Sequence, residues 1–499
     1  MRDILPPESA LWNRVEQIAR EVFGTFGFAE IRVPIFEQAD LFARSIGTET
    51  DIVSKEMFTF EDRPADVPNP RGKILTVEET GALEEAVRSG KIPSSDQNVT
   101  FIHELRKVLD QLVQLDGAAS DETTVSRVKE YQRLIQAYVY LAQFVRLGDS
   151  LTLRPEATAS VVRAYIEHGM HVLPGNVKLY YMGPMFRRER PQKGRYRQFY
   201  QIGAEVLGSS DAPGIDAEVI EMLMRLFERL KLKGAVLNIN SIGDKNCRPA
   251  YVEKLRAELK KVREQLGPDS QRRIETNPLR VLDSKLEHEQ PIIEKLPRIA
   301  KHLCESCREH YTEVKRQLGM RGIAYMENWR LVRGLDYYMS TTFEITAPGL
   351  GSQNAVCGGG RYDGLVELLG GPATTKGIGF AIGTDRLVLS LQEGGEGDAD
   401  KAGGIDVYLA WFGAAAHSAA IGLARRLRDA GFVVELPAVE MKFGKSLGLA
   451  DRLKARHAVI VGDNELAAGV VTVKRLSDGT QQKLGETELF AYLQTAKSM

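Results

Sequence analysis

The sequence predicts an α+β protein with helical insertions and a separate C-terminal α/β domain. Strand-like patterns recur along the first part of the chain, and helical stretches at 63–147 and 211–325 interrupt them. Residues 392–404 are rich in Gly, Glu and Asp without any periodicity, which is typical of an interdomain linker. Over 405–499, apolar runs alternate with helical stretches, and this alternation predicts a small, mostly parallel α/β domain.

Composition and charge are those of a multidomain globular protein. The 499 residues exceed what one hydrophobic core usually serves, and 43% of them are hydrophobic. Because the formal net charge is only -1, a nucleic-acid partner would need a local basic surface. Four cysteines are too few for a disulfide framework and fit a reducing compartment. No stretch has the length of a membrane span and the first residues lack an export signal, so we expect a cytoplasmic protein without a membrane partner.

Residues 1–62 predict a helix and then a strand. Apolar side chains follow helical spacing over 10–28, where two glycines end the run. Residues 30–37 then alternate polar and apolar side chains, and the central Pro34 favours a strand at a sheet edge or at an interface.

The next segment, 63–147, predicts a helical hairpin, because helical periodicity over 101–115 and 125–147 surrounds a polar turn at 117–124. The segment 211–325 is mostly charged amphipathic helix. Further strand patterns lie near 151 and at 177–186, 198–206, 236–239, 341–345 and 379–382. We therefore assign one discontinuous core domain to residues 1–62, 148–210 and 326–391.

A loop rich in cations joins two of these predicted strands. Residues 187–197 contain six cations and a single carboxylate, that of Glu189. Guanidinium groups bind phosphate oxygens bidentately, so a long hairpin tipped with arginine suits a polyphosphate, a nucleic-acid backbone or both. The alternative is a solvated charged turn.

Polar side chains occupy one face of the strand that follows this loop. Gln201, Gly203 and Glu205 alternate with apolar residues. A buried amide and a buried carboxylate need partners, and a substrate ammonium or ring N–H would provide one. Upstream, Glu156 and Thr158 open a helical run, where capping of the helix and ligand binding are equally good interpretations.

A second group of candidate residues lies at 333–338 and 356–364. Three adjacent glycines in the latter segment let the backbone approach a ligand closely, although a glycine-rich hairpin turn explains them equally well. The tyrosines offer rings and hydroxyls to a flat polar substrate. The glycine spacing does not fit a dinucleotide-binding motif, and Val439 stands where a P-loop would need its first glycine.

Residues 377–387 predict a glycine-bounded strand that enters a helix, with Arg386 in the first helical turn. A cation at this position opposes the helix dipole, and a phosphate ligand would resolve the conflict.

Four residues could in principle supply metal ligands: Cys247, Cys304, Cys307 and His310. Because the single Cys-x-x-Cys lies inside a charged helical pattern, we interpret these cysteines as ordinary reduced thiols and predict no metal site made by the protein alone.

Taken together, these segments resemble the class II aminoacyl-tRNA synthetases and, within them, the histidyl-tRNA synthetase family. The strand around Pro34 resembles class II motif 1, residues 186–205 resemble motif 2, and residues 377–387 resemble motif 3. Three further segments match stretches found in the histidine enzymes, namely 50–57, 333–338 and 358–364. The resemblance covers nearly the whole chain outside 63–147.

This resemblance implies an α+β catalytic domain built on an antiparallel sheet (the class II synthetase fold), a homodimer joined through motif 1, and a C-terminal α/β anticodon-binding domain. It implies that L-histidine is activated with ATP and Mg²⁺ to histidyl-adenylate and then transferred to the 3′ end of tRNA(His). The insertion 63–147 has no implied role, and a tolerated surface insertion is the simplest interpretation beside a tRNA-facing or dimer-stabilising one.

The resemblance also implies roles for single residues. Arg187 would bind the α-phosphate and Arg386 the γ-phosphate of ATP, with Glu189 and Arg195 completing the ATP site. Arg333 would approach the reacting carboxylate and the α-phosphate, which makes Arg187 and Arg333 the implied catalytic residues. The implied histidine pocket consists of Glu156, Thr158, Gln201, Glu205, Arg333, Tyr337, Tyr338 and Tyr362, and the implied contacts to the tRNA acceptor end are Arg190 and Gln192.

One residue departs from the family pattern, because Asp385 stands where motif 3 usually has a glutamate. Two other functions stay open. A non-catalytic, histidine-sensing regulatory subunit of ATP phosphoribosyltransferase shares the fold, but such proteins typically lose the catalytic arginines and the C-terminal domain that this chain keeps. A class II synthetase for threonine, proline or glycine is the third interpretation, and the segment 333–338 argues against it.

Overall fold

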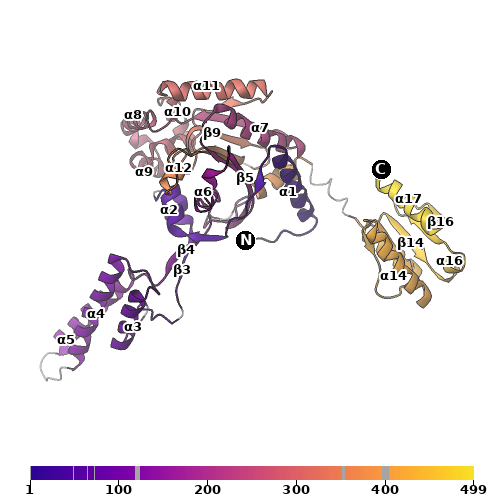
Figure 1. Cartoon of the computed structure of the whole chain (residues 1–499), viewed down its shortest axis with the longest axis horizontal. Helices are drawn as coiled ribbons and strands as arrows, with labels where there is room; N and C mark the ends of the chain where they lie inside the picture. The colour runs from indigo at the N-terminus through magenta and orange to yellow at the C-terminus, as the bar shows by residue number, and fades with distance from the viewer. Residues whose placement is uncertain are drawn as a thin grey trace. The chain divides into compact units, whose positions relative to one another are not determined.

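The computed structural model describes residues 2–48, 50–64, 66–71, 73–117, 124–190, 192–350, 354–395 and 404–498 (Figure 1). Apart from a short N-terminal segment, the chain divides into two compact units at Gly394 and Gly395. Part of the predicted linker, 396–403, and most of the predicted polar turn, 118–123, lie outside the described residues. None of the described helices is both long and apolar enough to cross a membrane.

An eight-stranded sheet forms the centre of the first unit, in the order β1-β5-β6-β11-β10-β9-β7-β8. The strands are β1 (Ala29–Glu30), β5 (Val177–Phe186), β6 (Gln198–Gly208), β7 (Val236–Ser241), β8 (Met326–Glu327), β9 (Met339–Thr346), β10 (Ala355–Arg361) and β11 (Lys376–Gly383). Every pairing from β5 to β7 is antiparallel, and only the two-residue edge strands β1 and β8 pair in parallel. The antiparallel sheet implied by the resemblance is therefore confirmed.

Helices surround this sheet and pack their buried side chains against it. They are α1 (Glu8–Thr25), α2 (Ala39–Ile46), α6 (Thr158–Glu167), α7 (Pro213–Arg229), α12 (Leu365–Leu368) and α13 (Thr384–Glu393), with a π-helical turn η1 (Ile52–Glu56) and a 3-10 turn η2 (Met170–Val172). A buried ion pair joins the sheet to α7, where Arg361 at the end of β10 contacts Asp216 at 2.6 Å. The predicted opening helix over 10–28 is confirmed as α1.

The prediction of a continuous strand over 30–37 is wrong for its central residues. The chain pairs as a strand only in β1 and in β2 (Phe36–Gln38). Between them, the carbonyls of Val33 and Pro34 accept hydrogen bonds from Nη1 of Arg154, at 2.7 and 3.1 Å. Since Pro34 also has no N–H to donate, a buried guanidinium takes the place of a neighbouring strand there.

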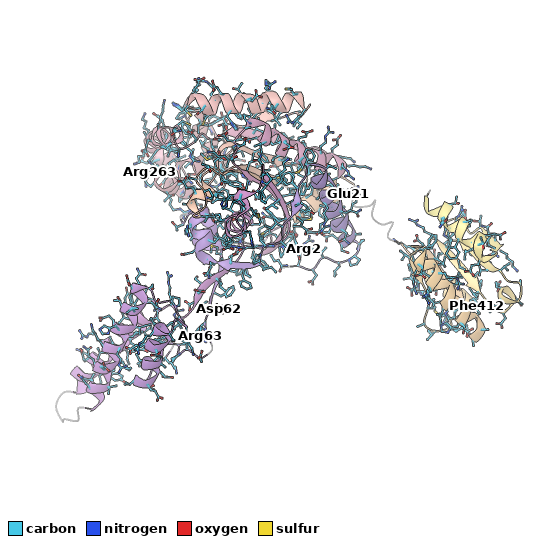
Figure 2. All side chains as sticks on the ribbon, viewed as in Figure 1. Arg2, Glu21, Asp62, Arg63, Arg263 and Phe412 are labelled. Carbon is cyan, nitrogen blue, oxygen red and sulfur yellow. The ribbon has the colours of Figure 1, made fainter. Side chains whose placement is uncertain are left out.

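A three-stranded sheet, β2-β4-β3, leads into the insertion. The insertion lies between β3 (Phe58–Asp62) and β4 (Asp149–Leu153), and Figure 2 labels Asp62 and Arg63 where the chain leaves β3. It contains α3 (Val77–Arg88), α4 (Asp96–Gly117) and α5 (Thr124–Ala142) around its own apolar core. Helix α3 was not predicted, although the capping box of Thr76 and Glu79 that begins this helix is visible in the sequence.

The segment 211–325 begins with the helix α7 and then contributes a strand to the main sheet. Strand β7 lies between β9 and β8, so this part of the segment is not separate from the sheet. The remainder consists of α8 (Arg248–Lys261), α9 (Pro268–Thr276), α10 (Gln290–Ile293) and α11 (Glu305–Met320), with 3-10 turns η3 (Arg263–Gln265), η4 (Pro278–Asp283), η5 (Glu287–Glu289) and η6 (Ile299–Lys301). The predicted domain boundaries in this region stay predictions.

The second unit has a five-stranded sheet in the order β13-β12-β14-β15-β16. Its strands are β12 (Val407–Trp411), β13 (Val434–Glu435), β14 (His457–Val461), β15 (Val471–Arg475) and β16 (Gln481–Leu484), and its helices are α14 (Ala414–Asp429), α15 (Phe443–Arg452), α16 (Asp463–Ala467) and α17 (Glu486–Ser498). The three predicted apolar runs pair in parallel as β12, β13 and β14, whereas β15 and β16, for which no strand was predicted, pair antiparallel. The hairpin that reverses the chain there turns at Gly479, which has a positive φ of 75°.

Candidate active site

A cavity of about 960 Å³ opens over the main sheet and brings most of the candidate residues together. Ten of them line its wall: Glu156, Thr158, Arg187, Glu189, Arg195, Gln201, Arg333, Tyr337, Tyr338 and Arg386. Glu205 and Tyr362 lie behind this wall and are bonded to it through Thr158. Arg190 and Gln192 do not line the cavity, and both side chains are exposed at the tip of the β5–β6 hairpin.

The N-terminus of α6 positions the first buried carboxylate. Glu156 accepts hydrogen bonds from the backbone N–H groups of Thr158 at 2.6 Å and of Ala159 at 3.0 Å. The capping interpretation of Glu156 is therefore confirmed, and the same geometry holds its carboxylate on the cavity wall. Burial is the largest influence on this group and raises its pKa.

The second buried carboxylate, Glu205, is held by two hydroxyl donors. Thr158 Oγ1 donates to one oxygen at 2.7 Å, and the Tyr362 hydroxyl donates to the other at 2.5 Å. Burial raises the pKa of Glu205 to about 8, although both hydrogen bonds act in the opposite direction. A carboxyl group in this state is mostly protonated at neutral pH and can share its proton with a basic ligand.

Three polar groups beside these carboxylates form no well-aligned hydrogen bond among the described residues, although two of them face Thr158. They are the hydroxyls of Tyr181 and Tyr337 and Oε1 of Gln201, all of which are buried. Buried polar atoms in native proteins are nearly always hydrogen-bonded, so an orphaned cluster at a cavity wall indicates a place for a polar ligand. Burial raises the pKa of both tyrosines, which keeps them as neutral donors.

Tyr181 is a residue that the sequence analysis missed. Its partner across the β5–β6 hairpin is Gly203, and a Cβ at that glycine would lie 2.3 Å from the tyrosine hydroxyl. The signal was present in the sequence, because a hairpin register that pairs a tyrosine with a glycine leaves the ring room to cover the strand.

Cations gather at the other end of the cavity. Arg195 Nη1 contacts Glu189 Oε2 at 3.2 Å, and Arg187 donates from Nε to the Pro155 carbonyl at 2.9 Å. The Arg386 side chain packs on Gly194 of the hairpin loop, with its Cγ 3.5 Å from an ideal Cβ at that glycine. Burial lowers the pKa of Arg386, and the nearby charge of Arg195 lowers it further. This excess of positive charge favours an anionic ligand.

Arg333 lies between the carboxylates and this cationic end. Its Nη1 donates to Glu344 on β9 at 2.7 Å. The guanidinium covers Gly358 so closely that a Cβ there would stand 2.0 Å from Nη2. Glu344 also lines the cavity and was not among the predicted residues.

The three adjacent glycines form the middle of strand β10, so the alternative of a glycine-rich turn is wrong. Each of them makes room for a neighbour rather than for a bend. A Cβ would meet Arg333 at Gly358, the Gly379 carbonyl and Phe343 at Gly359, and the Thr341 carbonyl and Tyr338 at Gly360. The glycines therefore let the ring and guanidinium groups of the site lie directly on the sheet.

Asp385, which replaces the usual glutamate, is engaged by the protein itself. Its Oδ2 accepts from the Tyr200 backbone N–H at 3.0 Å, and its Oδ1 pairs with Arg2 at 3.2 Å. The guanidinium of Arg2 also lies 5.0 Å from the Tyr196 ring centroid. Asp385 thus ties the N-terminal segment to motif 2.

Comparisons with known proteins agree with this geometry. Residues 141–387 match the family model for histidyl-tRNA synthetase, and residues 406–496 match an anticodon binding domain. A histidine–tRNA ligase of Solibacter usitatus is 46% identical, over 100% of this chain and 98% of its own length, and one of Koribacter versatilis is 45% identical, over 99% and 94%. These alignments include the 63–147 insertion.

The solved structure of apo histidyl-tRNA synthetase from S. aureus resembles the chain with a TM-score of 0.68 at 32% identity, covering 99% of this chain and 98% of the other. Sequence identity over the full length and a common fold thus agree with the arrangement of the cavity. The chain belongs to the histidyl-tRNA synthetase family.

Proposed function

We propose that this chain activates L-histidine with ATP to histidyl-adenylate and transfers the histidyl group to the 3′ end of tRNA(His). The observation that carries the proposal is that Arg187, Arg333 and Arg386 line the same cavity as Glu156 and Gln201. A triphosphate needs the first set of side chains, and an amino acid with a polar ring needs the second.

The carboxylate end of the cavity suits histidine. Glu205, whose pKa burial raises to about 8, lies behind the wall and would act on the imidazole, whose ordinary pKa is near 6.5, through the Thr158 hydroxyl. The unpartnered groups of Tyr181, Tyr337 and Gln201 offer hydrogen bonds to the ring and to the α-ammonium. Glu156 would add a negative charge for the ammonium, and Tyr338 would pack beside the ring. Tyr362 supports the wall from behind, because it contacts Tyr337, which in turn contacts Tyr338.

The cationic end suits ATP. Arg187 would bind the α-phosphate, Arg386 the γ-phosphate, and Arg195 with Glu189 would complete the nucleotide site. Mg²⁺, when bound, supplies further positive charge to the phosphates. The cavity carboxylates Glu189, Glu344 and Asp385 are each paired with an arginine already. We therefore propose that phosphate oxygens hold most of the magnesium coordination, with no site made by the protein alone.

The chemistry requires alignment and charge neutralisation but no protein nucleophile. The carboxylate of histidine is ionised at neutral pH, and one of its oxygens attacks the α-phosphorus while the bond to the β-phosphate oxygen breaks and pyrophosphate leaves. Arg333, between the two ends of the cavity, would stabilise the charge on the reacting groups. In the second step the 3′ hydroxyl of the terminal ribose attacks the histidyl carbonyl, an ester forms and AMP leaves.

The tRNA would contact both units. Arg190 and Gln192 are exposed at the hairpin tip, where they can reach an acceptor end that enters the cavity. The second unit would bind the anticodon. We further propose a homodimer joined through the motif 1 region, where Ile35, Phe36 and Phe60 are about half exposed, and a cytoplasmic location.

Histidine-dependent exchange of labelled pyrophosphate into ATP tests this proposal. We expect exchange with histidine and none with threonine, proline or glycine. Arg333→Ala should lose exchange while a histidine-induced thermal shift partly survives, and Arg225→Ala, an exposed arginine on α7, serves as the matched control. A chain that binds histidine without any exchange would favour the regulatory subunit of ATP phosphoribosyltransferase, and exchange with another amino acid would contradict the substrate.

A further inference from the structure

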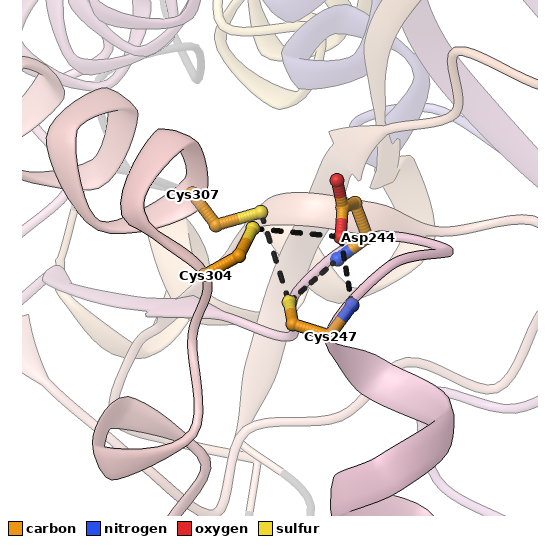
Figure 3. A group of neighbouring side chains, drawn as sticks. All are labelled: Asp244, Cys247, Cys304 and Cys307. Atoms are coloured by element: carbon orange, nitrogen blue, oxygen red, sulfur yellow. Dashed lines mark hydrogen bonds between the residues drawn. The ribbon is translucent and has the colours of Figure 1, made fainter.

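Three cysteines and an aspartate meet where the loop after β7 faces the start of α11 (Figure 3). Asp244 and Cys247 lie in the loop between β7 and α8, whereas Cys304 and Cys307 lie at the start of α11. Their four ligand atoms all lie within 4.8 Å of one another, and this is the one such group among the described residues. His310, considered as a ligand from the sequence, is elsewhere, since its Nε2 lies 2.9 Å from Asp216.

The separations between these atoms fit a tetrahedral metal. The Sγ atoms of Cys247 and Cys307 are 3.9 Å apart, and Cys304 Sγ is 3.8 Å from Asp244 Oδ1. Four ligands arranged tetrahedrally around Zn²⁺, with Zn–S bonds near 2.3 Å, place sulfur atoms about 3.8 Å from one another. The side chains therefore need little movement to enclose an ion.

The surroundings of the four groups suit negatively charged ligands. Cys247 precedes α8, and Cys304 and Cys307 begin α11, so the positive ends of two helices point at the thiols. The backbone N–H of Asp244 donates to Cys247 Sγ at 3.4 Å, and the N–H of Cys247 orients the Asp244 carboxylate at 3.1 Å. Gly243, with φ of 68°, permits this tight loop, because a Cβ there would lie 2.8 Å from Cys247 Sγ.

We propose that Asp244, Cys247, Cys304 and Cys307 form a structural Zn²⁺ site. Three thiolates and one carboxylate satisfy the tetrahedral preference of zinc and leave no open position, which is typical of structural rather than catalytic sites. Cys247 and Cys307 are only 8% and 5% exposed, whereas Asp244 and Cys304 are partly exposed, so a bound ion would be buried on one side and reachable by solvent on the other.

The site would brace the histidine pocket from behind. Ser340 exchanges backbone hydrogen bonds with Ile242 at 2.9 Å and with Gly243 at 2.8 Å. Arg248, the residue after Cys247, donates from Nη1 to the Tyr338 carbonyl at 2.5 Å. Zinc would thus join α11 to the loop that holds Tyr338, and its loss should weaken the fold and histidine binding without removing any group that takes part in the reaction.

Metal content of the full-length protein, purified under reducing and chelator-free conditions, tests the site. We expect about one zinc per chain by elemental analysis, released when a mercurial reagent titrates the thiols. Refolding with Co²⁺ in place of zinc should give the thiolate-to-cobalt absorption of a tetrahedral sulfur site. These measurements use the wild-type chain, so they decide the question even where a variant does not fold.

Variants locate the ion. Cys304→Ser and Cys307→Ser should each reduce bound zinc to less than about a tenth of an equivalent and lower the melting temperature. Cys357→Ser is the matched control, because Cys357 is the one other cysteine and lies on β10 outside the group, and it should keep its zinc. Asp244→Asn should retain the ion but lose it to a chelator at least tenfold faster.

Three results would overturn the proposal. They are wild-type protein without zinc or a cobalt spectrum, zinc retained in both the Cys304→Ser and Cys307→Ser variants, and a Cys247–Cys307 disulfide in protein prepared without oxygen. None of them bears on pyrophosphate exchange, so this inference and the proposed function stand or fail separately.

Discussion

Gly358→Ala should disable adenylation by displacing Arg333 while leaving the sheet intact. An alanine Cβ at this position would lie 2.0 Å from Nη2 and 2.2 Å from Cζ of Arg333. Real Cβ atoms essentially never approach a heavy atom within 3.0 Å, so the guanidinium must retreat by about 1 Å and disturb its 2.7 Å hydrogen bond to Glu344. A misplacement of about 1 Å commonly reduces the rate about 100-fold, which corresponds to about 2.7 kcal/mol of transition-state stabilisation.

The assay is pyrophosphate exchange, with melting temperature as the measure of folding. Gly364→Ala is the matched control, because nothing lies within 4 Å of its added Cβ, and it should keep wild-type exchange. A double-mutant cycle identifies the cause. Once Arg333→Ala has removed the guanidinium, Gly358→Ala should cause little further loss. Additive losses in the cycle, or full activity in Gly358→Ala, would refute the reasoning.

Three further predictions concern the carboxylate, the nucleotide and the dimer. Because the pKa of Glu205 rises from 4.5 to about 8 on folding, the protonated carboxyl stabilises the folded state fully below pH 4.5, and this stabilisation is lost as the pH rises towards 8. Without histidine, the melting temperature of wild type should therefore fall relative to that of Glu205→Gln between pH 4.5 and 8. A difference in melting temperature that does not change with pH would contradict the raised pKa. Arg386→Ala should reduce kcat/KM for ATP about 100-fold with histidine binding retained, and an unchanged ATP dependence would exclude the phosphate role. Phe36→Asp should convert the dimer to monomers in sedimentation velocity, since Phe36 is 53% exposed beside Phe60, and a persistent dimer would place the interface elsewhere.

Local periodicity was enough to predict the long elements of this fold. The opening helix, the β5–β6 hairpin and the helices α4 and α5 each have a pattern that neighbouring residues alone determine. The prediction of a strand through Pro34 was wrong because the backbone carbonyls there accept hydrogen bonds from Arg154, a residue more than a hundred positions away. No local pattern contains that contact.

The glycines of β10 illustrate a second limit. Local propensity assigns Gly358 to Gly360 to a turn, since glycine is depleted in strands. Only the fold reveals that Arg333, Phe343 and Tyr338 pack against these glycines on alternate faces of the strand, where a Cβ would collide with them. The same holds for the cysteines, because 57 positions separate Cys247 from Cys304 in the sequence and helix packing brings them together.

More of the candidate site than of the surrounding fold could be predicted, because charged and polar residues in otherwise apolar strands can be recognised from the sequence alone. Gln201 on β6 was predicted in this way, Arg386 was predicted from its position in the first turn of α13, and both line the cavity. Glu344 was missed although it is a carboxylate within a predicted strand, and Tyr181 was missed because its signal is the pairing with Gly203 on the neighbouring strand and not its own segment.

A structure of the protein with L-histidine and a non-hydrolysable ATP analogue would test the central claim most directly. We predict that Arg187, Arg333 and Arg386 contact the phosphates or the histidine carboxylate, and that the imidazole lies against Glu205. A triphosphate bound away from these arginines, or a histidine side chain turned from Glu205 into solvent, would contradict the account.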